Sequence, residues 1–160
     1  MSDLEVIAEP GRQDIVMTRT FDAPRDVVYR AMSDPELLTR WWGLDSTTTV
    51  IDRLDLRPGG SWRFVEKDRD GQEYAFHGVV HDAREPEGFT QTFEFEGMPG
   101  HVLLERHTLE EVEGRTLYTS LAVFQSVEDR DGMVASGMED GARQSMDRLE
   151  ELLRTLRTQG

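Results

Sequence analysis

TRTFDAPRDVVYRAMSDPELLTRWWG, residues 18–43, is the stretch that decides the fold of this chain. It begins with the end of a strand, and residues 22–24 (Asp-Ala-Pro) are typical of a helix start, with proline at or near the first helical position. Apolar residues then recur at helical spacing, and residues 34–35 (Asp-Pro) repeat the start signal. Gly43 follows the last apolar residue and predicts the end of a second helix. The stretch therefore predicts two short helices in succession after a first strand.

The strand that precedes these helices is residues 14–21 (DIVMTRTF), in which apolar and polar side chains alternate. Ile15 and Phe21 share one face, and Arg19 falls on that face too. Either Arg19 is a buried, paired arginine, or the alternation breaks there. Before the strand, we expect residues 1–12 to form a flexible N-terminal arm.

From about residue 46 to residue 124 the pattern is that of strands. β-Branched and aromatic residues alternate with polar ones, as in FTQTFEFE, and turn residues separate the segments. Residues 70–71 (Asp-Gly) are the pair favoured in two-residue hairpins, and residues 85–88 (Glu-Pro-Glu-Gly) predict another turn. Short strands joined by tight turns predict an antiparallel meander of about six strands.

The chain ends in a helical pattern that begins at Ser126, a plausible N-terminal cap. Glycines weaken its first half, because each costs about 1 kcal/mol relative to alanine. We expect such glycines where the helix bends or where another backbone approaches closely. One apolar stripe follows the helix and consists of Met138, Ala142, Met146, Leu149, Leu153 and Leu156.

These elements predict an α+β fold in which a curved antiparallel sheet wraps around one long C-terminal helix. The helix is the only element large enough to cover the apolar face of the sheet. A curved sheet around one helix often leaves a gap where the two diverge. We expect that gap between the glycine-rich half of the helix and the aromatic-rich strands.

The same order of elements, and four strings within it, resemble the START-like or SRPBCC superfamily with its helix-grip fold. Within it, the chain is most similar to the branch named after the Hsp-90 ATPase activator domain. The strings are TRTFDAPRDVVYRAMSDPELLTRWWG, LDLRPGGSWRF, GVV and SVEDRDGMVASGMEDGARQSMDRLEELL. The resemblance covers about residues 14–156 and implies one domain over residues 13–157 with a deep cavity between sheet and helix. Many relatives have proline after Trp-Trp-Gly, where this chain has Leu44.

Composition excludes several classes of function. The 160 residues favour one domain, and the net charge of −14 disfavours nucleic acid and anionic membrane surfaces as partners. The acidic excess is either a self-repelling soluble surface or a docking face for a basic partner. The absence of cysteine excludes disulfides, thiol catalysis and cysteine metal sites. No secretory signal and no apolar run of about 20 residues is present, so we expect no membrane span and a cytoplasmic protein.

The strand aromatics, with side chains from the C-terminal helix, are the candidate lining of a ligand cavity. Trp41 completes the stripe of the second short helix and should pack, which leaves Trp42 near the entrance. Plain core packing is the competing interpretation, and a one-residue slip would exchange the two faces of a strand. Arg143 either orients a ligand or pairs on the surface with Glu139 or Asp147. The full candidate set is Trp41, Trp42, Trp62, Phe64, Tyr74, Phe76, Phe93, Phe95, Met138, Ala142, Arg143 and Met146.

No residue pattern predicts catalysis, a metal or a cofactor. His77 and His81 share a strand face opposite the aromatics and should point outward. A metal site formed by them with Glu105 has no compact ligand motif behind it. The chain contains no phosphate loop followed by Gly-Lys-Ser/Thr and no Gly-x-Ser-x-Gly elbow. The alternation of residues 101–112 assigns neither face to the cavity.

We therefore expect a protein that binds or sequesters a small hydrophobic or aromatic molecule. A cyclase-like or hydrolase-like enzyme acting on such a ligand is the first alternative. A chaperone-linked regulatory module is the second. An enzyme requires at least two ionisable side chains within hydrogen-bond reach inside the cavity, whereas a regulator requires a filled core and an external patch. An exposed Trp42 would also be compatible with a homodimer.

Overall fold

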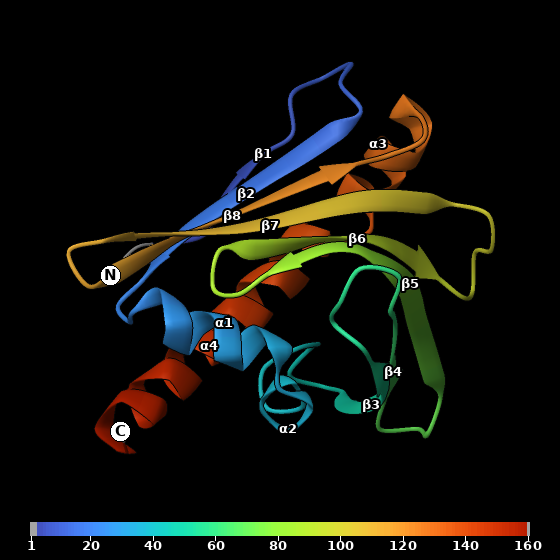
Figure 1. The fold of residues 1–160 in the computed structure, drawn as a ribbon. Coiled ribbons are helices and arrows are strands. Elements are labelled where there is room, and N and C mark those ends of the chain that lie inside the picture. Colours follow the sequence, from blue (N-terminus) through green and yellow to red (C-terminus); the bar gives the residue numbers. More distant parts are fainter. Residues whose placement is uncertain (1–2, 160) are drawn as a thin grey trace.

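An eight-stranded antiparallel curved sheet forms most of the molecule, with the strand order β1-β2-β8-β7-β6-β5-β4-β3 (Figure 1). The structure is a computed structural model that describes residues 3–159, with side chains as far as residue 157. Every neighbouring pair is antiparallel, and the six strands after the two short helices form the predicted meander. The strands are β1 (Glu5–Ile7), β2 (Asp14–Phe21), β3 (Thr48–Leu54), β4 (Ser61–Lys67), β5 (Glu73–Arg84), β6 (Gly88–Phe95), β7 (Val102–Val112) and β8 (Arg115–Val123).

Two short helices connect β2 to β3, as the opening stretch predicts, but the second ends at Leu38, so Trp41 and Gly43 lie in the turns that follow it rather than on the helix. The two helices are α1 (Arg25–Ser33) and α2 (Pro35–Leu38). Pro24 is the N-cap residue of α1, and the side chain of Asp34 caps α2 by accepting a hydrogen bond from the backbone of Glu36. These local signals set where the two helices begin, and α1 and α2 lie at one end of the sheet (Figure 1).

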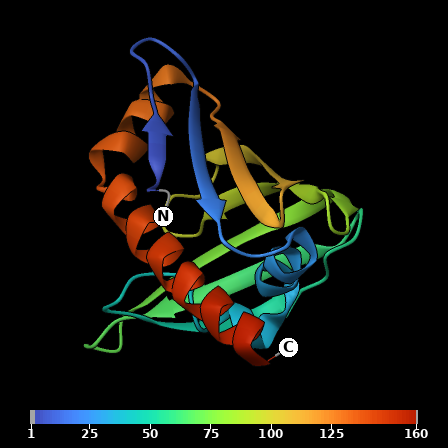
Figure 2. The ribbon, with the colours of Figure 1, turned by 90° about the vertical axis from the view of Figure 1, so that its left-hand side faces the viewer.

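The C-terminal helical region is two helices rather than one. Helix α3 (Val127–Ala135) ends at Ser136, and α4 (Met138–Gln159) follows directly. Gly137 separates them with φ of +85°, a conformation that glycine adopts at little cost. The sequence predicts that the first half of this C-terminal helical region is weak, and in the structure the helix is interrupted there. The longer helix, α4, then runs diagonally across the sheet (Figure 2).

The two halves of α4 differ in how deeply their apolar side chains are buried. Leu149, Leu152, Leu153 and Leu156 are buried and form the core with α1 and the sheet. Met138 and Ala142, in the first half, are only partly buried. The predicted apolar stripe is thus packed at its C-terminal end and looser at its N-terminal end.

Arg19 is a buried, paired arginine, which decides between the two interpretations of strand β2. Its side chain is 3% exposed, and its guanidinium donates to Asp147 and to Glu150, at 2.7 Å each. Both acids lie on α4. The ion pairs therefore tie β2 to the middle of the long helix.

The beginning of the chain differs from the loose arm that the sequence predicts over residues 1–12. Within the described part of that range, Glu5–Ile7 form β1 and pair with β2. Leu4 is 4% exposed and belongs to the core. The alternation is too short to read from sequence, since the strand has three residues at the edge of the sheet.

Candidate ligand-binding cavity

A cavity of about 720 Å³ lies between the concave face of the sheet and the N-terminal half of α4. The lining from α4 includes Gly141, Ala142, Ser145 and Met146, all within the loosely packed half. Several exposed residues also border the cavity, in the loop after α2, in the β4–β5 hairpin and at the α3–α4 junction. The mouth therefore lies among these three segments.

The two adjacent tryptophans take different places around this cavity. Trp41 is 5% exposed, and its indole N–H donates to the carbonyl of Ala31, 2.8 Å away. Trp42 is partly exposed and meets Phe64 and Phe76 edge to face, with ring centroids 5.0 and 5.6 Å apart. One tryptophan packs into the core, whereas the other joins the aromatic wall beside the mouth.

The structure brings the candidate residues around the cavity, with two exceptions. Arg143 does not line it: its guanidinium donates to Asp3, to the carbonyl of Leu4 and to Glu139. This corrects the ligand-orienting role, because the residue after Ala142 on the helix faces the N-terminal edge of the sheet. Phe95 lines a neighbouring chamber instead. Around the main cavity stand Trp41, Trp42, Trp62, Phe64, Tyr74, Phe76, Phe93, Met138, Ala142 and Met146.

The neighbouring chamber has a volume of about 500 Å³ and lies beneath α3. Phe95, Leu103, Phe124 and Met133 supply much of its apolar wall. Some residues border both spaces, namely Tyr74, Phe76, Phe93 and Ser136. The break between α3 and α4 thus stands over the partition between two chambers.

A chain of polar side chains crosses the wall of the main cavity on strands β6 to β8. Gln91 donates to Glu105 Oε1 over 3.1 Å, and the same oxygen lies 3.4 Å from His107 Nε2. His107 Nδ1 is 2.8 Å from the hydroxyl of Tyr118, which is 3% exposed. Burial, together with the charge of Glu105, raises the pKa of Tyr118 well above its ordinary range. The tyrosine therefore stays protonated and able to donate.

Sequence reasoning missed this polar chain because the alternation of residues 101–112 favours neither face. The pairing with the neighbouring strands settles the faces: Gln91 stands opposite Glu105, and His107 opposite Ser120. Gln91 is a sequence signal for this polar chain, because its position in FTQTFEFE places it on the same strand face as the aromatic residues.

His77 points to the convex face, as predicted, where it pairs with Glu94 and Glu96. Glu105 lies on the opposite face, so the metal site that joined it to the two histidines of β5 is wrong. Among residues 3–159, no group of three or more metal-binding side chains converges.

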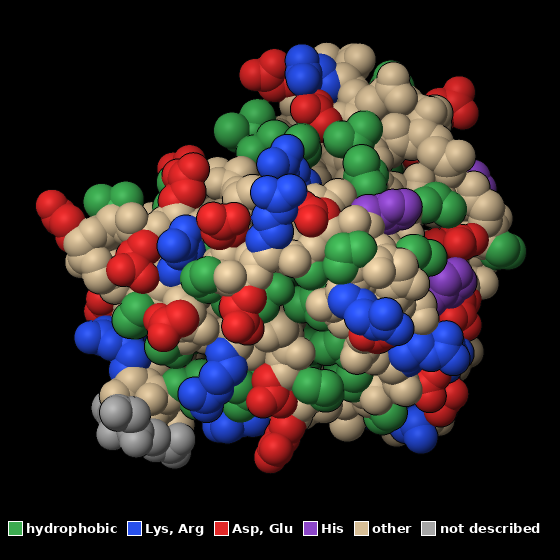
Figure 3. All heavy atoms as spheres, viewed as in Figure 1, with side chains coloured by type: hydrophobic (Ala, Val, Ile, Leu, Met, Phe, Trp, Pro, Cys, Tyr) green, Lys and Arg blue, Asp and Glu red, His purple; other side chains and the backbone are tan. Residues whose placement is uncertain are grey.

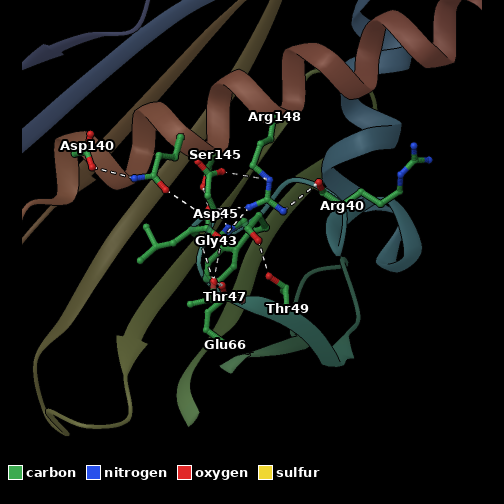
Figure 4. Close-up of polar contacts among 12 residues, drawn as sticks. Arg40, Gly43, Asp45, Thr47, Thr49, Glu66, Asp140, Ser145 and Arg148 are labelled. Atoms are coloured by element: carbon green, nitrogen blue, oxygen red, sulfur yellow. Dashed lines mark hydrogen bonds and ion pairs between the residues drawn. The ribbon is translucent and has the colours of Figure 1, made fainter. Parts of the chain in front are cut away.

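The loop after α2 is held to α4 by side chains of the helix (Figure 4). Ser145 donates to the carbonyl of Gly43 over 2.6 Å, and Arg148 donates to the carbonyls of Gly43, Leu44 and Arg40. Gln144 accepts from the backbone of Asp45. These bonds fix the loop that carries Trp42, in which Leu44 follows Gly43.

Glu66 lies beneath this loop and lines the cavity. It is 5% exposed, accepts from the hydroxyl of Thr47 over 2.6 Å, and its Oε2 is buried with no hydrogen-bond partner in the described part of the chain. Burial raises the pKa of the Glu66 carboxyl, because the ionised form loses more hydration than its partners replace.

Acidic and basic side chains are interspersed on the face that Figure 3 shows. No single-sign patch covers that face. None of the helices within residues 3–159 combines the length and the apolar character needed to cross a bilayer.

A curved antiparallel sheet closed by a long C-terminal helix, with a cavity between them, defines the helix-grip class of START-like proteins, a ligand-binding domain type. Residues 22–154 match the model of the family described as Activator of Hsp90 ATPase homolog 1-like protein, so the chain belongs to that family. No curated protein matches the chain.

Solved structures of bacterial proteins share the fold. Ms6760 from Mycobacterium smegmatis is 25% identical, with a TM-score of 0.84 over 93% of this chain and 95% of that one. A protein from Arthrobacter aurescens is 24% identical, with a TM-score of 0.86 over 94% and 91%. A protein from Rhodobacter sphaeroides is 21% identical, with a TM-score of 0.88 over 96% and 99%.

Proposed function

We propose that this protein binds or sequesters a small hydrophobic or aromatic molecule in the cavity between the sheet and α4. The observation that carries the proposal is the cavity of about 720 Å³, walled mainly by aromatic and aliphatic side chains. Pockets of roughly 300–1,000 Å³ with apolar walls and a few polar groups are typical of small-molecule sites. A regulatory module would need a filled core, and the cavity gives that alternative no support.

The aromatic wall is preorganised, which favours binding. Trp62 packs against Phe64 and Phe93, with ring centroids 4.9 and 5.7 Å apart. Its indole N–H donates to the carbonyl of Thr92, 3.0 Å away. Because the rings are already held by one another and by the backbone, a ligand would pay little to order them.

Tryptophan fluorescence tests the proposal directly, since all three tryptophans line the cavity. Titration with neutral aromatic compounds should shift or quench the emission, and Trp62→Phe should reduce the response. Val79→Ala, which changes an exposed side chain on β5, is the control and should leave the response intact. The proposal would be contradicted if the folded protein bound no member of a broad panel of such compounds, by fluorescence and by calorimetry.

Native mass spectrometry of gently purified protein identifies the ligand class without a panel. We expect a mass above that of the bare chain, which Ala142→Phe should abolish by filling the cavity. An unliganded mass from the native host, combined with a negative panel, would count against binding.

Acid–base catalysis on such a ligand is the second candidate, because Glu105, His107 and Tyr118 form a hydrogen-bonded chain on the cavity wall. This meets the requirement for two ionisable groups within reach of one another. An enzyme should convert the co-purified molecule on incubation, and His107→Gln should stop conversion while binding persists. A ligand recovered unchanged by mass spectrometry supports binding alone.

A further inference from the structure

The ionisable groups that line the cavity are acidic, apart from one histidine. Glu66, Asp68, Glu105 and His107 border the main cavity, and none of its lining residues in the described part of the chain is lysine or arginine. Even with Glu66 protonated and His107 charged, the lining keeps a net negative charge. The smaller chamber repeats the pattern with Glu128, Asp129 and His101.

The arginines nearest the cavity are already paired. Arg19 is matched by two carboxylates, the buried one of Glu150 and the exposed one of Asp147, so its charge is fully compensated. Arg148 donates to three backbone carbonyls of the loop after α2, and Arg143 pairs with Asp3 and with Glu139 of α4. Among the described residues, these three arginines are engaged elsewhere and none of them lines the cavity.

Glu105 is the acid best placed to meet a ligand. Its Oε1 is occupied by Gln91 and His107, whereas its Oε2 has no hydrogen bond to any residue that the structure describes. The side chain is 19% exposed and lines the cavity, so Oε2 is accessible there. The strand neighbours Phe89 and Phe93 flank Gln91 on the same face and border the same space.

These charges decide between ligands of equal size. A carboxylate would enter a space whose lining is net negative and includes no lysine or arginine among the described residues, which costs desolvation and like-charge repulsion. A protonated amine would gain a charge-assisted hydrogen bond to Glu105 and attraction to nearby ring faces. A neutral alcohol could donate one hydrogen bond to Glu105, but it would gain no ion pair and no cation–π attraction and would meet no like-charge repulsion.

We propose that the cavity selects a hydrophobic amine, a molecule with an apolar body and a protonated amino group, and that Glu105 Oε2 accepts from that group. This inference rests on the proposed binding function and names the charge class of the ligand. The apolar body lies among the aromatic residues of the wall.

Three ring-matched probes test the selection: 1-naphthylmethylamine, 1-naphthylmethanol and 1-naphthoic acid, titrated at pH 7 by isothermal calorimetry. We expect the amine to bind about tenfold or more tightly than the alcohol, since its hydrogen bond to Glu105 is also an ion pair whereas that of the alcohol is not. The acid should bind most weakly. Glu105→Gln should remove about tenfold from the affinity for the amine and leave that for the alcohol within about twofold.

Glu110→Gln is the matched control, because it removes the same charge from an exposed position of the same strand. It should preserve the preference for the amine. An acid that binds as tightly as the amine overturns the selection, while binding of the alcohol shows that the cavity still functions. A preference that survives Glu105→Gln overturns the role of Glu105. Failure of all three probes overturns both proposals.

Discussion

Gly43 stands directly over the carboxyl group of Glu66. A Cβ at position 43 would overlap Oε1 of Glu66 and lie 2.9 Å from the hydroxyl oxygen of Thr49. Gly43 also has φ of +106°, which side chains rarely adopt. The glycine that ends the second helix signal in the sequence is therefore required twice, by its backbone conformation and by the buried acid beneath it.

Gly43→Ala should consequently destabilise the protein more than an ordinary substitution in a turn. We expect about 1–3 kcal/mol for the strained backbone and about 1–3 kcal/mol for the overlap. Gly100→Ala is the control, since Gly100 has φ of +93° and no atoms near its missing Cβ. Urea unfolding of both variants separates the two costs, and equal losses would show that Glu66 simply moves aside.

The raised pKa of Glu66 makes stability depend on pH in a defined direction. Between the pKa of an unfolded glutamate and the higher pKa of Glu66, the folded state holds more protons, so stability falls as pH rises. Glu66→Gln removes that titration. The variant should gain stability relative to the wild type as pH rises through this window and hold the gain above it.

Urea unfolding at a series of pH values measures the difference. Glu110→Gln, which changes an exposed carboxylate on β7, is the control for altered net charge. A difference between Glu66→Gln and the wild type that does not change with pH would contradict the assignment to Glu66.

Because the ion pair of Arg19 with Glu150 is buried, the stability lost on replacing Arg19 should depend strongly on whether Glu150 is still present. Arg19→Met leaves Glu150, which is 7% exposed, without its partner in the core, and should cost about 3–5 kcal/mol. The double variant Arg19→Met, Glu150→Met should lose less than the single one, because no unpaired charge remains.

Arg12→Met is the matched control, because the Arg12–Asp14 pair lies on the surface with Arg12 58% exposed. An exposed pair of this kind contributes little to stability, so Arg12→Met should unfold at nearly the same urea concentration as the wild type. A double variant less stable than Arg19→Met would show that the unpaired Glu150 carries no penalty, which would contradict the prediction.

The local signals of the sequence predict the fold well because each is set by nearby residues. Asp34 caps α2, and hairpin turns fix the antiparallel order. The glycines of the C-terminal region illustrate the limit. Gly137 breaks the helix, whereas Gly141 stays helical and allows close approach, since its Cβ would lie 3.1 Å from the side chain of Leu44. Both outcomes are expected of glycine, and only tertiary contacts decide which occurs where.

The same limit applies to the candidate site. Aromatic residues on clearly alternating strands, such as Phe93, can be placed on the concave face from sequence. Glu105 and His107 cannot, because Leu103 and Leu104 are apolar neighbours that face opposite sides of β7, one buried and one exposed. Strand pairing fixes that register, so the polar part of the cavity depends on contacts distant in sequence.

Filling the cavity is the most direct test of its use. Ala142 lies on α4, is partly buried and borders the cavity, so Ala142→Phe should occupy the space that a ligand needs. We expect affinity for 1-naphthylmethanol to fall by about tenfold or more, while stability stays equal or rises by about 0.5–2 kcal/mol, as is typical of cavity filling. Ala135→Phe, at an exposed position on α3, should change neither quantity. Calorimetry and urea unfolding measure both, and undiminished binding by a stably folded Ala142→Phe would place the ligand outside this cavity.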